Sequence, residues 1–511
     1  MLAYLKRLAA SGAAYQASSL VAAVLAVFTL PLYTRYLTRP ELGYAETLLT
    51  SIILASILLR FGIGEAFVRF YFDEDDERRR RHLARTVTGF VLLLTTVTGL
   101  VALVFAGAIS QALLNTRDAT LVAFGLLGMW AFTNLEVAYA LLRVDERRRA
   151  YLAASVSNVV LTVGLTVTLV VGFGTGARGY VLGNYAASTI VLVGLWVLAL
   201  RDRVGIPGPR AVRAWSLRPL LAFGGPTVPA DAAVFALNVV DRAYLVRADS
   251  PSAAGLYSVS VKLATVVIVA VRGFQAAWPP LAYSISDDRE AKRLYASVTT
   301  LYALCTGLVV AALVLLGRWV VRLLAAPAYF GAHEALPWVG LGWALYGLFL
   351  VFVTIAGRAK VTTRMFPAAL AGLAVNVAVL VALVGPLGIE AAGIALCAAY
   401  LVMLVVVHAL TRRVFTVPFE WDRLALLVAV VGGVSVAGEV LLPSSGVTGF
   451  VTRAAALGAI PLLLLALGFV RPEETARLRS LAARRRRAGA DAADEDQETV
   501  VAGADIPPGG P

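Results

Sequence analysis

Charged side chains stand inside stretches of this sequence that are otherwise apolar and long enough to cross a membrane. They include Arg60, Glu65, Arg69, Asp231, Asp241, Arg242, Lys262 and Arg272. A lone charge in hydrocarbon costs between about 2.5 and more than 10 kcal/mol, so such residues face other helices or a water-filled cavity. Most of these deep charges are basic. They therefore indicate a binding site for an anion and argue against a cavity built for cations.

Arg60 is the basic residue that lies deepest in its stretch. It stands about ten residues from the nearer end, roughly 15 Å at 1.5 Å per helical residue. Its planar, permanently charged guanidinium suits phosphate oxygens, which makes Arg60 a candidate anion ligand. The alternative is a pairing with an acid from another helix, such as Glu136 or Asp231. Gly62 would allow the helix to bend or another helix to approach closely.

Glu65 and Arg69 follow in the same stretch, four residues apart. Residues at this spacing lie on one face of a helix and can form an ion pair. Glu65 is therefore a candidate coupling or gating residue. We expect the longer Arg69 side chain to extend to the lipid headgroups.

A further stretch, residues 219–246, begins with Pro226 and Pro229. Proline frees backbone carbonyls and bends helices, so we expect a break there. Asp231 follows, and it either takes up a proton or cation during transport or pairs with an arginine. Asp241 and Arg242, near the other end, form either a structural pair or a gate.

Lys262 and Arg272 share the next stretch, ten residues apart, and so face adjoining sides of one helix. We expect Arg35, Arg60, Lys262 and Arg272 to point toward a central cavity. Arg272 has no obvious acidic partner on its own helix.

The composition of the chain indicates that these residues lie on membrane-spanning helices. Hydrophobic residues make up 59% and charged residues 15% of the chain, and the mean hydropathy is +0.80. These values exclude an ordinary soluble domain. The net charge of +13 is concentrated in loops. It is explained by membrane orientation and anionic headgroups, so no nucleic-acid partner is expected.

The loops alternate in charge along the whole chain. We assign 32 of the 45 lysines and arginines to loops on one side of the membrane and 8 to loops on the other. By the positive-inside rule, both termini are cytoplasmic and the protein is a multi-pass protein of the cell membrane. The sequence thus predicts an all-α polytopic fold with about 14 transmembrane helices. They cover 11–37, 42–69, 84–112, 119–142, 150–173, 178–200, 219–246, 253–283, 294–316, 335–357, 365–385, 388–411, 424–442 and 450–470.

The segments between these helices predict five parts. An N-terminal lobe (1–200) and a C-terminal lobe (219–412) are joined by a cytoplasmic linker (201–218) that is rich in Arg, Gly and Pro. Two extra helices occupy 413–470, and the polar tail 471–511 is expected to be disordered. No loop has room for a soluble catalytic domain. Two apolar-span cysteines and three scattered histidines give no metal ligand set, so neither an enzyme nor a metal or other cofactor is expected.

The two lobes also repeat each other. Asn158 and Asn376 each precede an apolar run, a glycine-rich turn and a small-residue entry to the next helix. Arg35 with Gly43-Tyr44 matches Arg242 with Gly255-Leu256-Tyr257. A repeat of six helices returns the chain to its starting side, so the lobes should be related by a pseudo-twofold axis along the membrane normal.

Three segments resemble a known group of transporters. PLYTRYLTRPELG (31–43), Asp241-Arg242 followed by GLYSVSVKLA (255–264), and GPLGIEAAGIA (385–395) are similar to the polysaccharide-export branch of the multidrug/oligosaccharidyl-lipid/polysaccharide superfamily. The resemblance covers residues 11 to about 412. It implies a flippase that moves undecaprenyl-pyrophosphate-linked sugar units from the cytoplasmic to the outer leaflet, with membrane lipids and glycosyltransferases or polymerases as partners.

We therefore expect Arg60 and Arg272, one from each lobe, to hold the substrate pyrophosphate. A multidrug or cation antiporter of the same superfamily is the main alternative, although it should have an acidic cavity. A membrane glycosyltransferase or polymerase is a further alternative, but such enzymes usually carry acidic residues on a large external loop. The identity of the sugar, the coupling ion and the oligomeric state do not follow from the sequence.

Overall fold

A computed structural model describes residues 21, 24–203, 217–359 and 365–471 of the chain. Within these residues the fold is built from helices, and no strand occurs. Among the described residues, thirteen helices are long and apolar enough to span a membrane. The first predicted span adds a helix over residues 24–36, while its earlier part lies outside the described residues. The all-α, polytopic architecture predicted from the sequence is confirmed.

The first half of the chain, residues 24–203, supplies α2 (Arg39–Arg60), α3 (Ile63–Asp73), α4 (Glu77–Val104), α5 (Ala106–Leu114), α6 (Ala119–Val144), α7 (Arg148–Val167) and α8 (Gly176–Gly194). Short π-helical turns, η1 (Thr168–Gly172) and η2 (Leu195–Ala199), extend α7 and α8. Asp76, Asp118 and similar residues begin helices by accepting hydrogen bonds from exposed backbone N–H groups.

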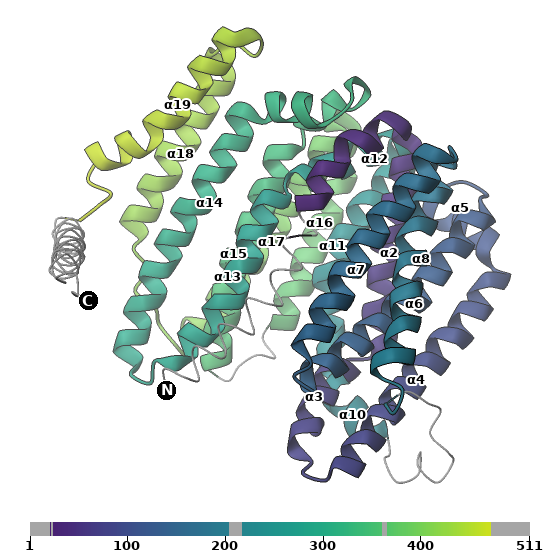
Figure 1. The fold of residues 1–511 in the computed structure, drawn as a ribbon. Coiled ribbons are helices and arrows are strands. Elements are labelled where there is room, and N and C mark those ends of the chain that lie inside the picture. The colour runs from purple at the N-terminus through teal and green to yellow at the C-terminus, as the bar shows by residue number, and fades with distance from the viewer. Residues whose placement is uncertain (1–20, 22–23, 204–216, 360–364, 472–511) are drawn as a thin grey trace, which may run out of the picture.

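The second half, residues 217–411, supplies α10 (Leu217–Gly224), α11 (Val228–Ala248), α12 (Pro251–Leu263), α13 (Thr265–Ser284), α14 (Asp288–Leu324), α15 (Leu336–Arg358), α16 (Met365–Leu387) and α17 (Ile389–Thr411). Two more helices, α18 (Trp421–Leu441) and α19 (Gly446–Ala466), follow. They pack mainly on each other and on α14, at the outer edge of the bundle (Figure 1).

One loop differs from its prediction. The sequence pattern places a long connection at 317–334, but α14 continues through the amphipathic RWVVRLL segment to Leu324. Only the 3₁₀ turns of η4 (Pro327–His333) remain between α14 and α15. Arginine is a good helix former and is favourable near a helix C-terminus, so the basic residues of this segment are compatible with the helix. Arg318 also pairs with Glu439 on α18, with 3.1 Å between Nη2 and Oε1.

Four spans are broken into two helices each. In the second span, α2 ends at Arg60 because Phe61 and Gly62 both adopt left-handed backbone conformations before α3 begins. The predicted proline break separates α10 from α11 at η3 (Gly225–Thr227). Two further breaks, between α4 and α5 at Phe105 and between α12 and α13 at Ala264, were not predicted.

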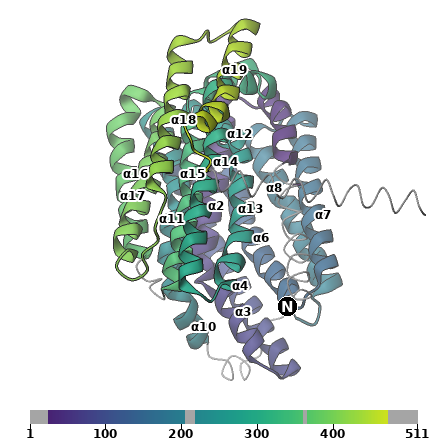
Figure 2. The same ribbon diagram turned by 90° about the vertical axis from the view of Figure 1, so that its left-hand side faces the viewer.

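These breaks send half-helices of the second half against the first half. The half-helix α12 packs on α2, whereas α13 packs on α15 and α14. Likewise α10 packs on α3, whereas α11 packs on α16 and α2. The α2–α12 contact and the α3–α10 contact lie at opposite ends of the bundle (Figure 2).

The buried side chains form an interior with three main parts. One apolar cluster draws on residues 63–200 and adds Leu220 from α10. A second draws only on residues 233–419, and a third contains residues from both halves. Each half therefore has its own core, and the shared cluster holds the halves together.

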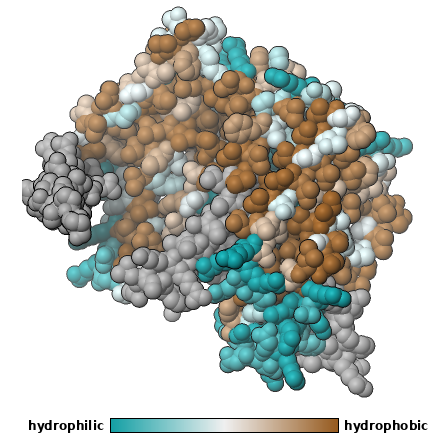
Figure 3. All heavy atoms as spheres, viewed as in Figure 1, coloured by the Kyte–Doolittle hydropathy of each residue, from teal (hydrophilic) through white to brown (hydrophobic). Residues whose placement is uncertain are grey.

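The two ends of the molecule differ in charge. The end with the turns 74–76, 145–147 and 201–203 is rich in arginine, and we call it the arginine-rich end. Hydrophobic side chains cover much of the visible face between this end and the opposite, arginine-poor end (Figure 3). Such an apolar band is what contact with lipid requires.

Candidate functional site

Arg60 lies at the edge of a cavity between α2, α3, α4 and α6. The cavity has a volume of about 380 Å³. Its lining consists of Arg60, Gly64, Phe67, Val68, Val87, Glu136, Val137, Ala140 and Arg143. Two cations and one acid thus face a space that is otherwise mostly apolar, which leaves the cavity with an excess of positive charge.

The position of Arg60 follows from the end of α2. The helix stops at this residue, and Arg60 Nε donates a hydrogen bond to the carbonyl oxygen of Ser56 at 3.3 Å. Its Nη1 lies 3.8 Å from Oε2 of Glu136. Both side chains are close to 30% exposed. Of the two acids considered from the sequence, Glu136 is therefore the partner, and the pair is long and partly solvated.

Arg272 occupies the second half of the chain, on α13. Its side chain is exposed, and no carboxylate of the described residues lies within 4.0 Å of its nitrogens. Tyr346 on α15 lies within electrostatic reach of both Arg272 and Asp231. Asp231 is also exposed, in the first turn of α11 just after the proline break.

Lys262 has a partner that the sequence analysis did not identify. Its Nζ lies 2.7 Å from Oε1 of Glu46 on α2, so the pair joins the two halves of the chain. The hydroxyl of Tyr180, on α8, donates a second hydrogen bond of 2.7 Å to the same oxygen. Glu46 is 8% exposed. The lysine therefore lies at the interface between the two halves, with its own side chain 22% exposed.

Arg35 is exposed and lies four residues before α2, at the arginine-poor end. Arg60 ends the same helix, whose 22 residues span roughly 33 Å at 1.5 Å per residue. The expectation that Arg35 points into one cavity with Arg60 is therefore wrong. Lys262 and Arg60 also differ in surroundings, one in an interface and one at a cavity.

Asp241 and Arg242 are adjacent in sequence, but their side chains do not pair. Asp241 is fully buried and accepts hydrogen bonds from Tyr257 Oη (2.9 Å) and Asn376 Nδ2 (3.0 Å). Arg242 turns toward Ser258 Oγ (3.3 Å) and the carbonyl oxygen of Asn238 (2.9 Å). The prediction that Asp241 and Arg242 pair with each other is thus wrong. The two residues instead join α11 to α12 and to α16.

The side chain of Glu65 lies outside the described residues. Arg69, its expected partner, lies 3.7 Å from Asp73 and stacks over the ring of Phe223 on α10, 5.2 Å from the centroid. The Arg69 side chain is 62% exposed, which agrees with the expected extension to the surface.

A larger hollow of about 660 Å³ opens at the arginine-rich end. Its charges are satisfied by one another: Tyr71 donates to Asp145, and Arg203 lies 3.4 Å from Asp145 and 3.3 Å from Glu77. Burial raises the pKa of Tyr71, and the hydrogen bond to Asp145 raises it further, so the hydroxyl stays protonated and remains a donor. This network ties the ends of α3, α6 and α8 together.

Sequence reasoning passed over Glu46, Arg143 and Tyr180. An acid within an apolar stretch indicates a functional or paired residue, so Glu46 could have been identified from the sequence. Tyr180 carried no signal, because tyrosines near helix ends are common in membrane proteins. Within the described part of the chain, no group of three or more His, Cys, Asp or Glu side chains is placed to hold a metal ion.

The sequence and the fold were compared with known proteins. A family described as "Polysaccharide biosynthesis protein" matches residues 8–286. A search of curated proteins returns no match.

Among solved structures, the chain resembles the lipid II flippase MurJ in an inward closed conformation. The TM-score is 0.71 at 13% identity, covering 88% of this chain and 98% of that one. It also resembles a multidrug resistance MATE family transporter of the MOP superfamily in an inward-facing conformation, with a TM-score of 0.60 at 14% identity, covering 81% and 95%. The outward-facing conformation of such a transporter gives 0.55 at 14% identity, covering 82% and 95%. These likenesses concern the fold.

Proposed function

The chain belongs to the polysaccharide biosynthesis protein family, and from that premise we propose that it flips a lipid-linked oligosaccharide across the cell membrane. The substrate is an oligosaccharide on a polyprenyl pyrophosphate, here an undecaprenyl carrier. The direction is from the cytoplasmic leaflet, at the arginine-rich end, to the outer leaflet. Both termini are cytoplasmic in this proposal.

The observation that carries the proposal is the exposed cation Arg272 inside a membrane-spanning helix. A cation at such depth is costly unless it faces water or an anion. Within the described residues, no carboxylate lies close enough to neutralise it. Arg60 and Arg143, from the other half of the chain, add two more cations beside a cavity. Their surplus positive charge suits a pyrophosphate, whose oxygens accept paired hydrogen bonds from guanidinium groups.

The fold supports a mechanism of alternating access. A hydroxyl-rich, doubly charged headgroup cannot cross hydrocarbon unaided, whereas a polar path between two half-bundles would shield it from lipid. The two halves touch through the α2–α12 contact at one end and the α3–α10 contact at the other, and α11 also packs on α2. Opening one contact while the other stays closed would expose the cations to one side of the membrane at a time.

A transport assay in liposomes tests this function. Protein is reconstituted with a fluorescent polyprenyl-pyrophosphate oligosaccharide, and its arrival in the opposite leaflet is followed with a membrane-impermeant quencher. We expect Arg60→Ala and Arg272→Ala each to slow transport roughly tenfold or more, the scale of a lost charge-assisted hydrogen bond. Arg117→Ala, an exposed arginine at the arginine-poor end, should transport like the wild type. Wild-type rates in both test variants would contradict the proposal.

A further inference from the structure

At the arginine-poor end, α2 and α12 meet backbone to backbone. A Cβ built on Gly43 would overlap the carbonyl oxygen of Pro251 and lie 2.9 Å from the nitrogen of Gly255. A Cβ on Gly255 would overlap the carbonyl oxygen of Arg39 in turn. Each glycine thus faces the carbonyl four residues before the other. No side chain fills this contact, so nothing bulky has to rearrange when it opens.

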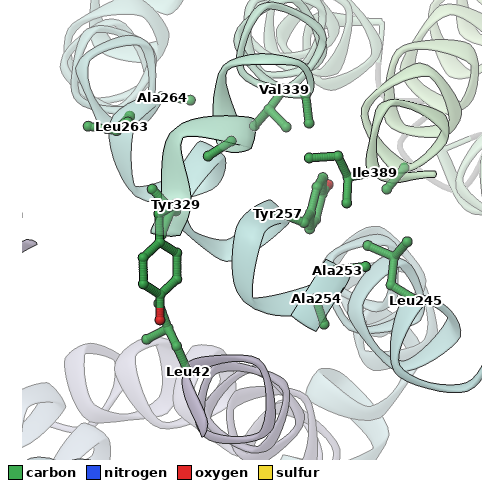
Figure 4. Close-up of a cluster of buried hydrophobic side chains, with 14 of the residues drawn as sticks. Leu42, Leu245, Ala253, Ala254, Tyr257, Leu263, Ala264, Tyr329, Val339 and Ile389 are labelled. Carbon is green, nitrogen blue, oxygen red and sulfur yellow. The ribbon is translucent and has the colours of Figure 1, made fainter. Parts of the chain in front are cut away.

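The η4 turn closes over the same contact. The hydroxyl of Tyr329 donates to the carbonyl oxygen of Leu37 at 2.9 Å, and the backbone N–H of Ala326 donates to Oγ1 of Thr34 at 3.0 Å. Figure 4 shows Tyr329 pointing from η4 toward Leu42 on α2, with Ala254 of α12 nearby. These hydrogen bonds hold the second half of the chain on the first half.

Deeper in the same interface lies an ion pair that joins the two halves, in the Glu46 cluster of Glu46, Lys262 and Tyr180. Lys262 is in the last turn of α12, directly before the break at Ala264. Its ammonium group contacts Glu46 and lies 5.9 Å from the centre of the Tyr180 ring. Glu46 carries both of its contacts on one oxygen, one from each half of the chain. If Lys262 leaves, Tyr180 still keeps a hydrogen bond to Glu46.

This arrangement makes the interface sensitive to a competing anion. Lys262 gains nothing by leaving Glu46 for hydrocarbon, because an unpaired buried charge is strongly disfavoured. Because the Lys262 side chain is 22% exposed, another anion can reach it and take the place of Glu46. Glu46 is then exposed to water as the two halves separate, which removes the cost of leaving it unpaired.

We propose that Glu46 is a built-in counter-ion of Lys262, and that the anionic group of the transported lipid displaces it and so opens the outer contact between the two halves. This inference rests on the proposed function, because it needs an anionic substrate. It assigns Glu46 and Tyr180 the role of positioning residues. It also explains how opening toward the outside is tied to loading: without an anion, the interface stays shut.

The test measures access to the α2–α12 contact from the outside. Cys305 and Cys397 are replaced, and Ala254, which is fully buried on α12, becomes a reporter as Ala254→Cys. A membrane-impermeant maleimide is added outside to the reconstituted full chain. Labelling of the wild-type reporter should be low and should rise several-fold when polyprenyl pyrophosphate is included in the bilayer.

The Glu46→Gln variant should label several-fold faster without any lipid anion and gain little from adding one. Lys262→Met should behave in the same way, which guards against a folding defect in a single variant. The exchange E46K/K262E restores opposite charges and should return labelling toward the low level. Asp118→Asn is the matched control, since it removes an ion pair with Arg178 (3.0 Å) within one half at the same end; its labelling should not change.

Two results would overturn the inference. One is wild-type labelling in both Glu46→Gln and Lys262→Met. The other is open behaviour in those variants while polyprenyl pyrophosphate leaves the wild type closed. In either case the liposome transport assay tests the proposed function separately. Transport by the wild type would still support the flippase function, and only the counter-ion role of Glu46 would be rejected.

Discussion

At the scale of single residues, two of the candidate anion ligands in the described structure already have carboxylate partners. Arg60 has Glu136, and Lys262 has Glu46. The two pairs differ mainly in their acids, because Glu136 is 30% exposed beside a cavity and Glu46 is buried between the halves. An incoming pyrophosphate therefore meets weak competition from Glu136 for Arg60 and stronger competition from Glu46 for Lys262. Arg272 offers the least resistance, so we expect it to bind the headgroup first.

Replacing the acid of the weaker pair should improve binding. A partly exposed ion pair is worth about 0.2 to 1 kcal/mol, so Glu136→Gln should lower the Kd for a short-chain prenyl pyrophosphate by up to about fivefold. Binding is measured by calorimetry on the protein in detergent. Glu77→Gln, which removes an exposed acid at the same end but outside this cavity, serves as control. An unchanged or higher Kd in Glu136→Gln would show that the acid does not compete with the ligand.

At the scale of elements, the sequence predicted most spans and two of the four breaks. Glycine and proline change the backbone through their own covalent structure. The breaks at Gly62 and at Pro226 and Pro229 could therefore be predicted from the local sequence. The break at Ala264 lies in Leu-Ala-Thr, without glycine or proline. It marks the place where the helix stops packing on α2 and begins to pack on α15, which is a tertiary cause that no local pattern records.

The close contact between α3 and α10 can be tested by a substitution. Gly62 and Gly224 face each other, and a Cβ on Gly224 would overlap the carbonyl oxygen of Gly62. Gly224→Ala should therefore force the two half-helices apart, at a cost of about 1–3 kcal/mol. We expect a lower apparent melting temperature and slower transport. Gly225→Ala is the matched control, because a Cβ there meets nothing within 4 Å. Equal effects of the two substitutions would show that the close approach is unimportant.

At the scale of the whole molecule, the sequence showed which residues are unusual but not which of them meet. Glu136 was one of two acids considered for Arg60, since depth along a helix narrows the possible partners. Glu46 and Lys262 lie more than 200 positions apart in the chain. Their pairing depends on how the two halves dock, and Arg35 was misplaced for the same reason. Pairing across the halves requires three-dimensional information that composition and spacing do not contain.

The assignment of outside and inside depends on the uneven distribution of arginine, and it can be tested directly. With 32 basic residues assigned to one side and 8 to the other, retention of the arginine-rich loops in the cytoplasm should dominate insertion. A fluorescent-protein fusion directly after Arg203 should therefore be fluorescent. An alkaline phosphatase fusion at Asp249, between α11 and α12, should be active, because that enzyme folds only outside the cytoplasm. The reverse pattern would place the Glu46 cluster on the cytoplasmic side, and the anion would then open an entrance for the substrate instead of an exit.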